Sequence, residues 1–286
     1  MLAWSATSAT RAAQLAGADD RIEALDAQVQ DLRARAAQLC AELSAARRAA
    51  ADRFSAEVAT ELAALAMPRA RVAFVVTTTP DPAGLVLPAE APSSVMDPVR
   101  GAARIDDAAG KGAPPGPVAF RATGVDDVSL MLAANPGAPL RPIAQAASGG
   151  ELSRVMLAVQ VVLAGADPVP TMVFDEVDAG VGGAAAIEVG RRLQALSTRT
   201  QVIVVTHLAQ VAAFADRQLV VTKDSDGSVT ESSVQVVEGE RRVRELSRML
   251  AGLADSEAAG AHASELLELA HSASRRGWAG PASGAR

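Results

Sequence analysis

Two short apolar runs, each followed directly by polar side chains, constrain the fold of this chain more than any other feature. Residues 171–174 precede Asp175 and Glu176, and residues 201–206 precede His207, with a helical apolar pattern between the two runs. A strand, a helix and a second apolar strand predict neighbouring parallel strands in an α/β sheet. Because the carboxyl ends of such strands meet at one edge, we expect these polar side chains to share one site.

The residue types at these strand ends suit phosphoryl transfer. One carboxylate, Asp175, can hold Mg²⁺, usually through water, and the next, Glu176, can take the proton of an attacking water. An imidazole at His207 can contact a γ-phosphate and respond to its loss. The carboxylate pair and the histidine could also have a purely structural role, since acidic residues are common in strand-end turns and a single histidine can cap the next helix.

The segment Ser148-Gly149-Gly150-Glu151 opens an apolar helical run. The S-x-x-E spacing predicts a capping box at the start of a helix. A cap needs no glycine pair, whereas two glycines expose backbone N–H groups, which together with the helix dipole favour an anion. We therefore expect both a helix start and a contact with phosphate.

A long helix is predicted over about 19–64, because apolar residues alternate there by three and four positions. The repeating positions are Ile22, Leu25, Val29, Leu32, Ala36, Leu39 and Leu43. Three heptads of this kind are typical of a coiled-coil arm, although a core helix of a bundle stays as the alternative. Pro68 is expected to end the helix.

The remaining pattern divides the chain into an arm (1–66), an α/β part (67–272) and a flexible tail (273–286). Short strands are predicted near 71–76 and 128–133. Between them, 77–117 contains more than half of the 15 prolines and is predicted to be a loop or disordered insertion. The later expected elements are helices at about 149–165, 183–197 and 208–215, a hairpin at 217–223 and 229–237, and helices at 239–252 and 256–271.

Composition excludes several classes of protein. The formal charge of −6 gives no global electrostatic reason to bind nucleic acid, and 2% aromatic residues disfavour a base-stacking surface. The single cysteine, Cys40, fits a reducing compartment. No signal peptide or apolar stretch of membrane-spanning length is present in the sequence, so we expect a cytoplasmic protein and no membrane partner.

Taken together, the motifs resemble the ABC-type ATPase heads of the SMC class. Residues 148–154 are similar to the signature motif, 171–176 to Walker B, Asp178 to the D-loop aspartate and His207 to the switch histidine. Glu151 indicates the SMC-like branch, because transporter ATPases usually have Gln there. The likeness runs from the coiled-coil stretch to about residue 270.

This resemblance implies the C-terminal half of an ABC/SMC-type head, with a mostly parallel sheet and helices, after the returning arm of an antiparallel coiled coil. The implied cofactors are ATP and Mg²⁺. Asp175 would hold Mg²⁺, Glu176 would be the catalytic base, and His207 would sense the γ-phosphate. In a homodimer, ATP held by a second head would be contacted by Ser148, Gly149, Gly150 and Glu151, with Asp178 orienting groups across the interface.

Within the SMC-like class, residues 135–154, 174–181 and 206–212 resemble a bacterial branch that acts in recombinational repair of DNA double-strand breaks. Ala209 departs from that branch, which usually has Pro at this position. The likeness implies DNA as a partner and an association with the nucleoid. The small basic clusters, such as Arg47-Arg48 and Arg241-Arg242, are interpreted as solvated surface, so no residue is assigned to DNA contact.

The phosphate-binding loop G-x-x-x-x-G-K-[ST] does not occur in the 286 residues. Gly110-Lys111-Gly112 lacks the following Ser or Thr and any flanking strand, so we reject it as a P-loop. We expect this chain alone to bind ATP weakly and to be inactive without an N-terminal P-loop half. Two alternatives stay open: a non-catalytic coiled-coil interaction module on a degenerate or split half-head, and, less favoured by Glu151 and the arm, a transporter ATPase subunit.

Overall fold

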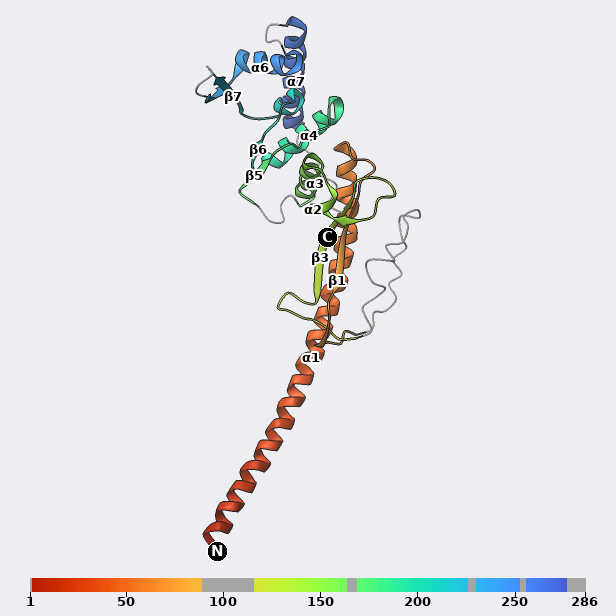
Figure 1. Cartoon of the computed structure of the whole chain (residues 1–286), viewed down its shortest axis with the longest axis vertical. Helices are drawn as coiled ribbons and strands as arrows, with labels where there is room; N and C mark the ends of the chain where they lie inside the picture. Colours follow the sequence, from red (N-terminus) through yellow and green to blue (C-terminus); the bar gives the residue numbers. More distant parts are fainter. Residues whose placement is uncertain (1, 89–115, 164–168, 226–229, 253–255, 277–286) are drawn as a thin grey trace. The chain divides into compact units, whose positions relative to one another are not determined.

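The computed structural model describes residues 2–88, 116–163, 169–225, 230–252 and 256–276 (Figure 1). The chain divides into two compact units, the first made of Met1–Ala51 and Val75–Ser129, the second of Asp52–Phe74 and Leu130–Arg286. The helices are α1 (Leu2–Ala64), α2 (Ile143–Ala146), α3 (Gly149–Val162), α4 (Gly183–Ser197), α5 (Ala209–Ala212), α6 (Gly239–Ala251) and α7 (Glu257–Arg276). The strands are β1 (Arg71–Thr78), β2 (Pro80–Leu85), β3 (Asp126–Ala133), β4 (Arg141–Pro142), β5 (Thr171–Phe174), β6 (Gln201–Val204), β7 (Gln218–Ser225) and β8 (Thr230–Val237).

Helix α1 includes the predicted helix at 19–64 and ends before Pro68, but it begins earlier than predicted, at Leu2. The large apolar side chains of its heptad row are exposed, among them Ile22 at 56% and Leu39 at 65%. The other large exposed members of the row are Leu25, Val29, Leu32 and Leu43. In the part of the chain that the structure describes, this apolar row faces solvent, which is the surface that a second helix of a coiled coil would cover. No described helix is long and apolar enough to cross a membrane.

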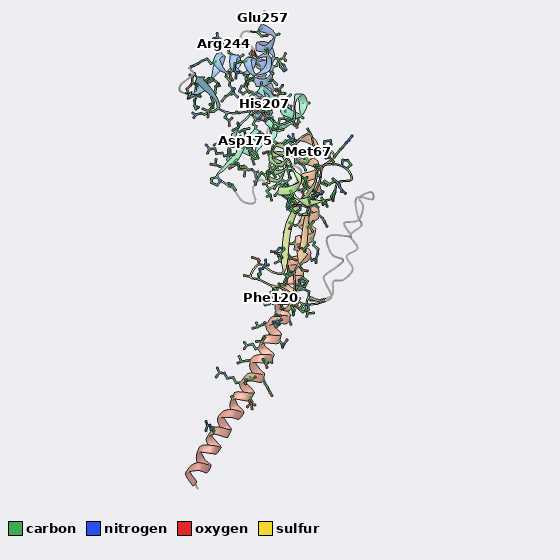
Figure 2. All side chains as sticks on the ribbon, viewed as in Figure 1. Met67, Phe120, Asp175, His207, Arg244 and Glu257 are labelled. Carbon is green, nitrogen blue, oxygen red and sulfur yellow. The ribbon has the colours of Figure 1, made fainter. Side chains whose placement is uncertain are left out.

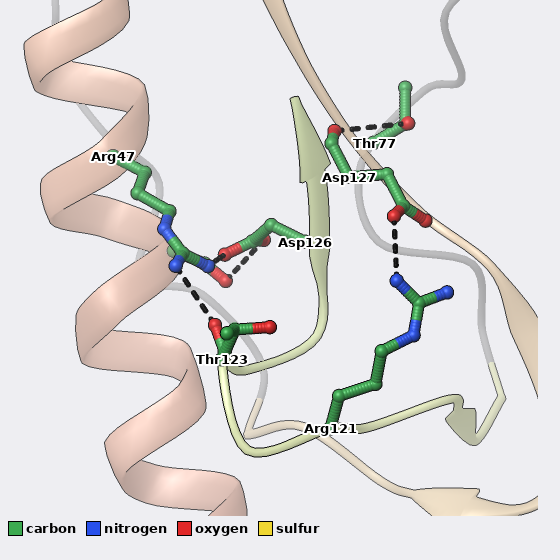
Figure 3. A network of polar contacts seen from close by, with 7 residues as sticks. Arg47, Thr77, Arg121, Thr123, Asp126 and Asp127 are labelled. Carbon is green, nitrogen blue, oxygen red and sulfur yellow. Dashed lines mark hydrogen bonds and ion pairs between the residues drawn. The ribbon is translucent and has the colours of Figure 1, made fainter. Parts of the chain in front are cut away.

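In unit 1, a buried carboxylate joins helix α1 to the start of β3 (Figure 3). The side chain of Asp126 is fully buried and accepts hydrogen bonds from Arg47 Nη1 at 2.8 Å and from Ser44 Oγ at 2.6 Å. Arg47 also donates to the carbonyl oxygen of Thr123 at 2.8 Å. Arg47 therefore has a specific partner inside unit 1, which corrects the interpretation of the Arg47-Arg48 cluster as solvated surface.

Strand β2 lies inside the segment 77–117 for which no regular structure was expected. The backbone of β2 and of the residue before it finds partners beyond residue 115: Asp81 N donates to the carbonyl oxygen of Pro117, and Ala119 N donates to that of Thr79. Leu85 and Val118 are each 1% exposed, so this contact also buries apolar surface. These long-range contacts have no local sequence signal. Residues 89–115 lie outside the described part of the chain.

Unit 2 is built around the parallel pair β5 and β6, as the sequence predicted. Thr171 pairs with Gln201, and the register continues to Phe174 and Val204. Phe174 belongs to the main apolar core, and the alternate residues Met172, Val202 and Val204 pack against it. The core is completed by apolar residues of the last turns of α1, of the turn after it and of helices α3 and α4, including Val58, Leu62, Leu65, Val155, Leu157, Val189 and Leu193.

The opposite face of this strand pair is apolar and open among the described residues. Val173 is 66% exposed, Ile203 is 45% exposed, and Val205, just past the strand end, is 59% exposed. Parallel sheets are normally covered on both faces, because helices flank them. This face therefore has the character of a surface that another segment covers.

The C-terminal elements form the antiparallel hairpin β7–β8 and a second small core. Leu246, Ala263 and Leu266 from helices α6 and α7 pack with residues of α5. Arg242 is partly buried and donates to the carbonyl oxygens of Ala212, Ala213 and Ala215, at and just after the end of α5. The interpretation of this arginine as solvated surface is therefore wrong.

Burial lowers the pKa of the Arg242 guanidinium. Helix α7 continues to Arg276, so residues 273–276, which the sequence analysis assigned to a flexible tail, are helical. Residues 277–286 lie outside the described part.

We expect Asp126→Ala to loosen the turn at residues 121–124, because it removes the acceptor shared by Arg47 and Ser44. Hydrogen bonds to charged groups contribute about 1.5–3 kcal/mol, so amide exchange in this turn should accelerate by about 10- to 100-fold. Hydrogen–deuterium exchange with mass spectrometry measures the effect locally. Arg121→Ala is the control, since the Arg121–Asp127 pair is exposed and should change exchange by less than about 5-fold. Equal effects of the two variants would contradict the role of Asp126.

The double change Val173→Thr and Val205→Thr is expected to reduce self-association of the 286-residue chain. Both side chains are more than half exposed, so the substitutions remove exposed apolar surface with little loss of burial. Light scattering after size-exclusion chromatography measures the effect. Val202→Thr is the matched control: it faces the core, so it should lower stability without reducing association. Association unchanged in the double variant would rule out this face as the contact surface.

Candidate functional site

The turn after β5 presents two exposed carboxylates on an anchored backbone. Asp175 and Glu176 are exposed, while the next residue, Val177, is fully buried in the core. Glu176 has a φ of 55°, which is uncommon for a residue with a side chain. The carbonyl oxygen of Glu176 accepts a hydrogen bond from Ala179 N at 3.0 Å, which closes the turn. The carboxylates thus stand on a turn that the core holds in place.

The start of helix α3 has the predicted capping arrangement. Ser148 is the N-cap, and the carboxylate of Glu151 accepts hydrogen bonds from the backbone N–H and from the hydroxyl of Ser148, both at 3.0 Å. The backbone hydrogen bond is the largest cause of a lowered pKa for Glu151. The ionised carboxylate therefore favours this helix start at neutral pH, and the contribution is lost as the pH falls through the lowered pKa.

Helix α3 begins directly against the carboxylate turn. Ser153 Oγ donates to the carbonyl oxygen of Asp175 at 2.7 Å, and Arg154 Nη1 donates to that of Ala179 at 2.6 Å. Arg154 is 7% exposed, and its burial lowers the pKa of its guanidinium. Two side chains one turn into the helix thus bind the backbone of the turn on both sides of Glu176.

The glycine pair at the start of α3 has a steric cause within this chain. A Cβ on Gly150 would lie 2.7 Å from the Ala179 Cβ and 3.0 Å from the Glu176 carbonyl oxygen. A Cβ on Gly149 would lie 2.7 Å from Oε2 of the Glu176 side chain. The pair therefore permits a close approach between helix and turn, in addition to the exposed N–H groups expected from the sequence.

His207 follows β6 and lies beside the same turn (Figure 2). Asp178, only 2% exposed, accepts hydrogen bonds from the Thr206 hydroxyl and from the backbone N–H of His207 at 3.2 Å. The Nδ1 atom of His207 lies 3.3 Å from Asp178 Oδ2, while 74% of the His207 side chain is exposed. The turn after β5 and the residues that follow β6 are therefore in contact through Asp178.

The structure brings all the site residues predicted from the sequence to one edge of unit 2. Sequence reasoning missed three side chains that join them: Ser153, Arg154 and Thr206. Ser153 and Arg154 lie inside the recognised motif, and Thr206 directly precedes His207. Their closeness in sequence to the predicted site residues therefore indicated that they could contribute to the site. Their partners are backbone oxygens and a buried carboxylate, which only the fold reveals.

Few side chains at this edge could act as ligands of a metal ion among the described residues. No group of three or more His, Cys, Asp and Glu side chains that could hold a metal is found among them. Asp175 offers one exposed carboxylate, which fits a contact to Mg²⁺ through water, with phosphate oxygens as further ligands. The ends of β5 and β6 and the start of α3 are thus compatible with one side of a phosphate site.

The order of the motifs and the positions of the strand ends fit the resemblance to SMC-like heads that the sequence shows. No family model matches the sequence. The DNA repair protein RecN of Streptomyces coelicolor is 55% identical over 239 residues, which cover 84% of this chain and 37% of that protein. RecN of Mycobacterium leprae is 45% identical over 270 residues, which cover 94% of this chain and 43% of that protein.

The chain belongs to the family of DNA repair proteins named RecN, and it spans about two fifths of the length of these relatives. Solved SMC structures align more weakly. An SMC ATPase studied for ATP-driven dimerisation and DNA-stimulated activation is 18% identical with a TM-score of 0.38, over 72% of this chain and 97% of that one. The Smc head domain from Pyrococcus yayanosii is 19% identical with a TM-score of 0.41, over 68% of this chain and 28% of that one. The family assignment rests on the sequence relatives.

We expect Gly150→Ala to destabilise unit 2 by about 1–3 kcal/mol, because the added methyl group meets a fixed Cβ and a backbone oxygen. Gly149→Ala is the matched variant. Its methyl group meets only the mobile end of Glu176, so the free energy of unfolding should change by less than about 1 kcal/mol. Urea denaturation followed by circular dichroism compares the two. A larger loss for Gly149→Ala would contradict the close approach described here.

Proposed function

We propose that this chain forms part of an ATPase that acts in recombinational repair of DNA double-strand breaks, with ATP bound between two dimerised heads. The observation that carries the proposal is the meeting of three motifs at one edge: the capped start of α3, the carboxylate turn after β5 and the histidine after β6. The family supports the repair role, since the relatives are named DNA repair proteins.

Each site residue has a role in this proposal. Asp175 holds Mg²⁺ through water, and Glu176 accepts the proton of the water that attacks the γ-phosphate. His207 contacts the γ-phosphate. The segment Ser148–Glu151 closes over ATP that a second head holds, as the ABC signature motif, and residues 171–176 serve as Walker B. Asp178 is proposed to contribute to the nucleotide site as well.

The proposed activity needs a phosphate loop that these 286 residues do not contain. Another polypeptide segment must therefore provide most contacts to the β- and γ-phosphates. The open apolar face of β5–β6, with Val173, Ile203 and Val205, supports the docking of such a segment. We propose the P-loop half of the family's head as its occupant.

A second candidate function is a non-catalytic interaction module. The open heptad row of α1, with Ile22 and Leu39 more than half exposed, favours it, because such a row binds another helix whether or not ATP is hydrolysed. DNA is proposed as a partner through the family alone, and no described residue is assigned to it.

The deciding experiment mixes the 286-residue chain with the N-terminal portion of the Streptomyces coelicolor relative and measures ATP turnover. We expect turnover only in the mixture, and we expect Glu176→Gln to slow it by about 10²- to 10⁴-fold while nucleotide binding survives. Asp52→Asn, on the surface of α1, is the control and should leave turnover unchanged. Absence of turnover in a stable complex would favour the interaction module. Micromolar ATP affinity of the chain alone, by titration calorimetry, would refute the need for a second segment.

A further inference from the structure

One oxygen atom of Asp178 serves as an acceptor for two consecutive residues of the neighbouring strand end. Oδ2 receives the hydroxyl hydrogen of Thr206 and the backbone N–H of His207, and it lies 3.3 Å from Nδ1 of the His207 ring. All three groups belong to the same chain and the same unit. Asp178 is almost completely buried, so its carboxylate is directed into this contact and away from solvent.

Both partners of the contact are held by their own surroundings. The Thr206 hydroxyl also accepts a hydrogen bond from Leu208 N at 3.1 Å, which fixes the side chain above the start of α5. The Asp178 carbonyl oxygen accepts from Val181 N at 3.2 Å, and the preceding Val177 is fully buried. The Asp178 carboxylate and the backbone of His207 are therefore held in place by contacts within the chain, with Nδ1 of the exposed ring 3.3 Å from Oδ2.

A carboxylate next to one ring nitrogen decides which nitrogen of a neutral histidine carries the hydrogen. We infer that Asp178 is a positioning residue that holds His207 with its hydrogen on Nδ1, so that Nε2 is the ring atom presented to solvent and to a ligand. This orientation acts within one chain and needs no second head.

The inference deepens the proposed function and rests on it for its consequence. In the neutral ring, Nε2 carries a lone pair and accepts hydrogen bonds. His207 can then donate to a phosphate oxygen only as imidazolium, with the buried carboxylate of Asp178 balancing the charge on the opposite side of the ring. The neutral ring accepts a hydrogen bond at Nε2, and an oxygen of a terminal phosphate that itself carries a proton can donate it.

The test is nuclear magnetic resonance of the ring nitrogens in the ¹⁵N-labelled 286-residue chain, at a pH where imidazole is neutral. The chain has only 3 histidines, so assignment is direct. We expect His207 to show a hydrogen-bearing Nδ1 and a bare Nε2. The exposed His271 on α7 serves as the internal reference and should show the mixture typical of a free ring, in which Nε2 carries the hydrogen more often.

Two variants separate positioning from folding. Asp178→Asn keeps a carbonyl oxygen that can accept from Thr206 and from His207, so the Nδ1–H form should persist. Asp178→Ala removes the acceptor, and the His207 signals should move to the pattern of His271. If the alanine variant does not fold, the wild-type and asparagine spectra still decide the question.

The inference is overturned if His207 in the wild-type chain matches His271, or if a folded Asp178→Ala variant keeps the Nδ1–H form. Neither measurement requires ATP turnover. A missing ATPase activity together with an Nδ1–H ring would therefore refute the proposed function alone, and turnover together with a free-ring pattern would refute this inference alone.

Discussion

The close approach of helix α3 to the turn after β5 is the contact on which the arrangement of the site depends. Gly150 permits the approach, and Ser153 and Arg154 secure it through backbone oxygens of the turn. The buried Arg154 guanidinium makes a charge-assisted hydrogen bond through Nη1, which offsets part of the cost of its burial. With helix and turn joined in this way, the carboxylate of Glu176 stands next to Gly149. The parallel pairing of β5 and β6 then adds His207 to the same edge.

The same region also explains why the chain exposes so much apolar surface. Each strand of the β5–β6 pair uses alternate residues for the core, so the residues between them point to the other face, where Val173 and Ile203 stay in contact with solvent. The heptad row of α1 in unit 1 likewise consists of apolar side chains that are exposed to solvent. In both places a regular repeat produces an apolar surface that the described residues do not cover. Such surfaces are typical of a protein that works as part of a larger assembly.

Much of the secondary structure was predictable because local patterns decide it. Helix α4 covers the predicted range 183–197, and the capping box at Ser148 and Glu151 followed from its spacing. Strand β2 was not predictable, since its partners lie beyond residue 115 and its own sequence contains Pro80 and Pro82. The roles of Arg47 and Arg242 were also missed, because a basic pair in a sequence carries no information about the carboxylate or carbonyl oxygens that it meets.

The sequence by itself determined the order of the elements, the strand ends on which Asp175 and His207 lie, and the class of chemistry that these residues suit. These properties follow from periodicity and from the limited set of connections between parallel strands. Only the tertiary structure decided that the glycine pair contacts the Glu176 turn, that Thr206 and Asp178 form a hydrogen bond, and that Asp178 is buried beside His207. Such contacts join residues that are distant in the chain, and their energy depends on distances of a few tenths of an ångström, which no local pattern specifies.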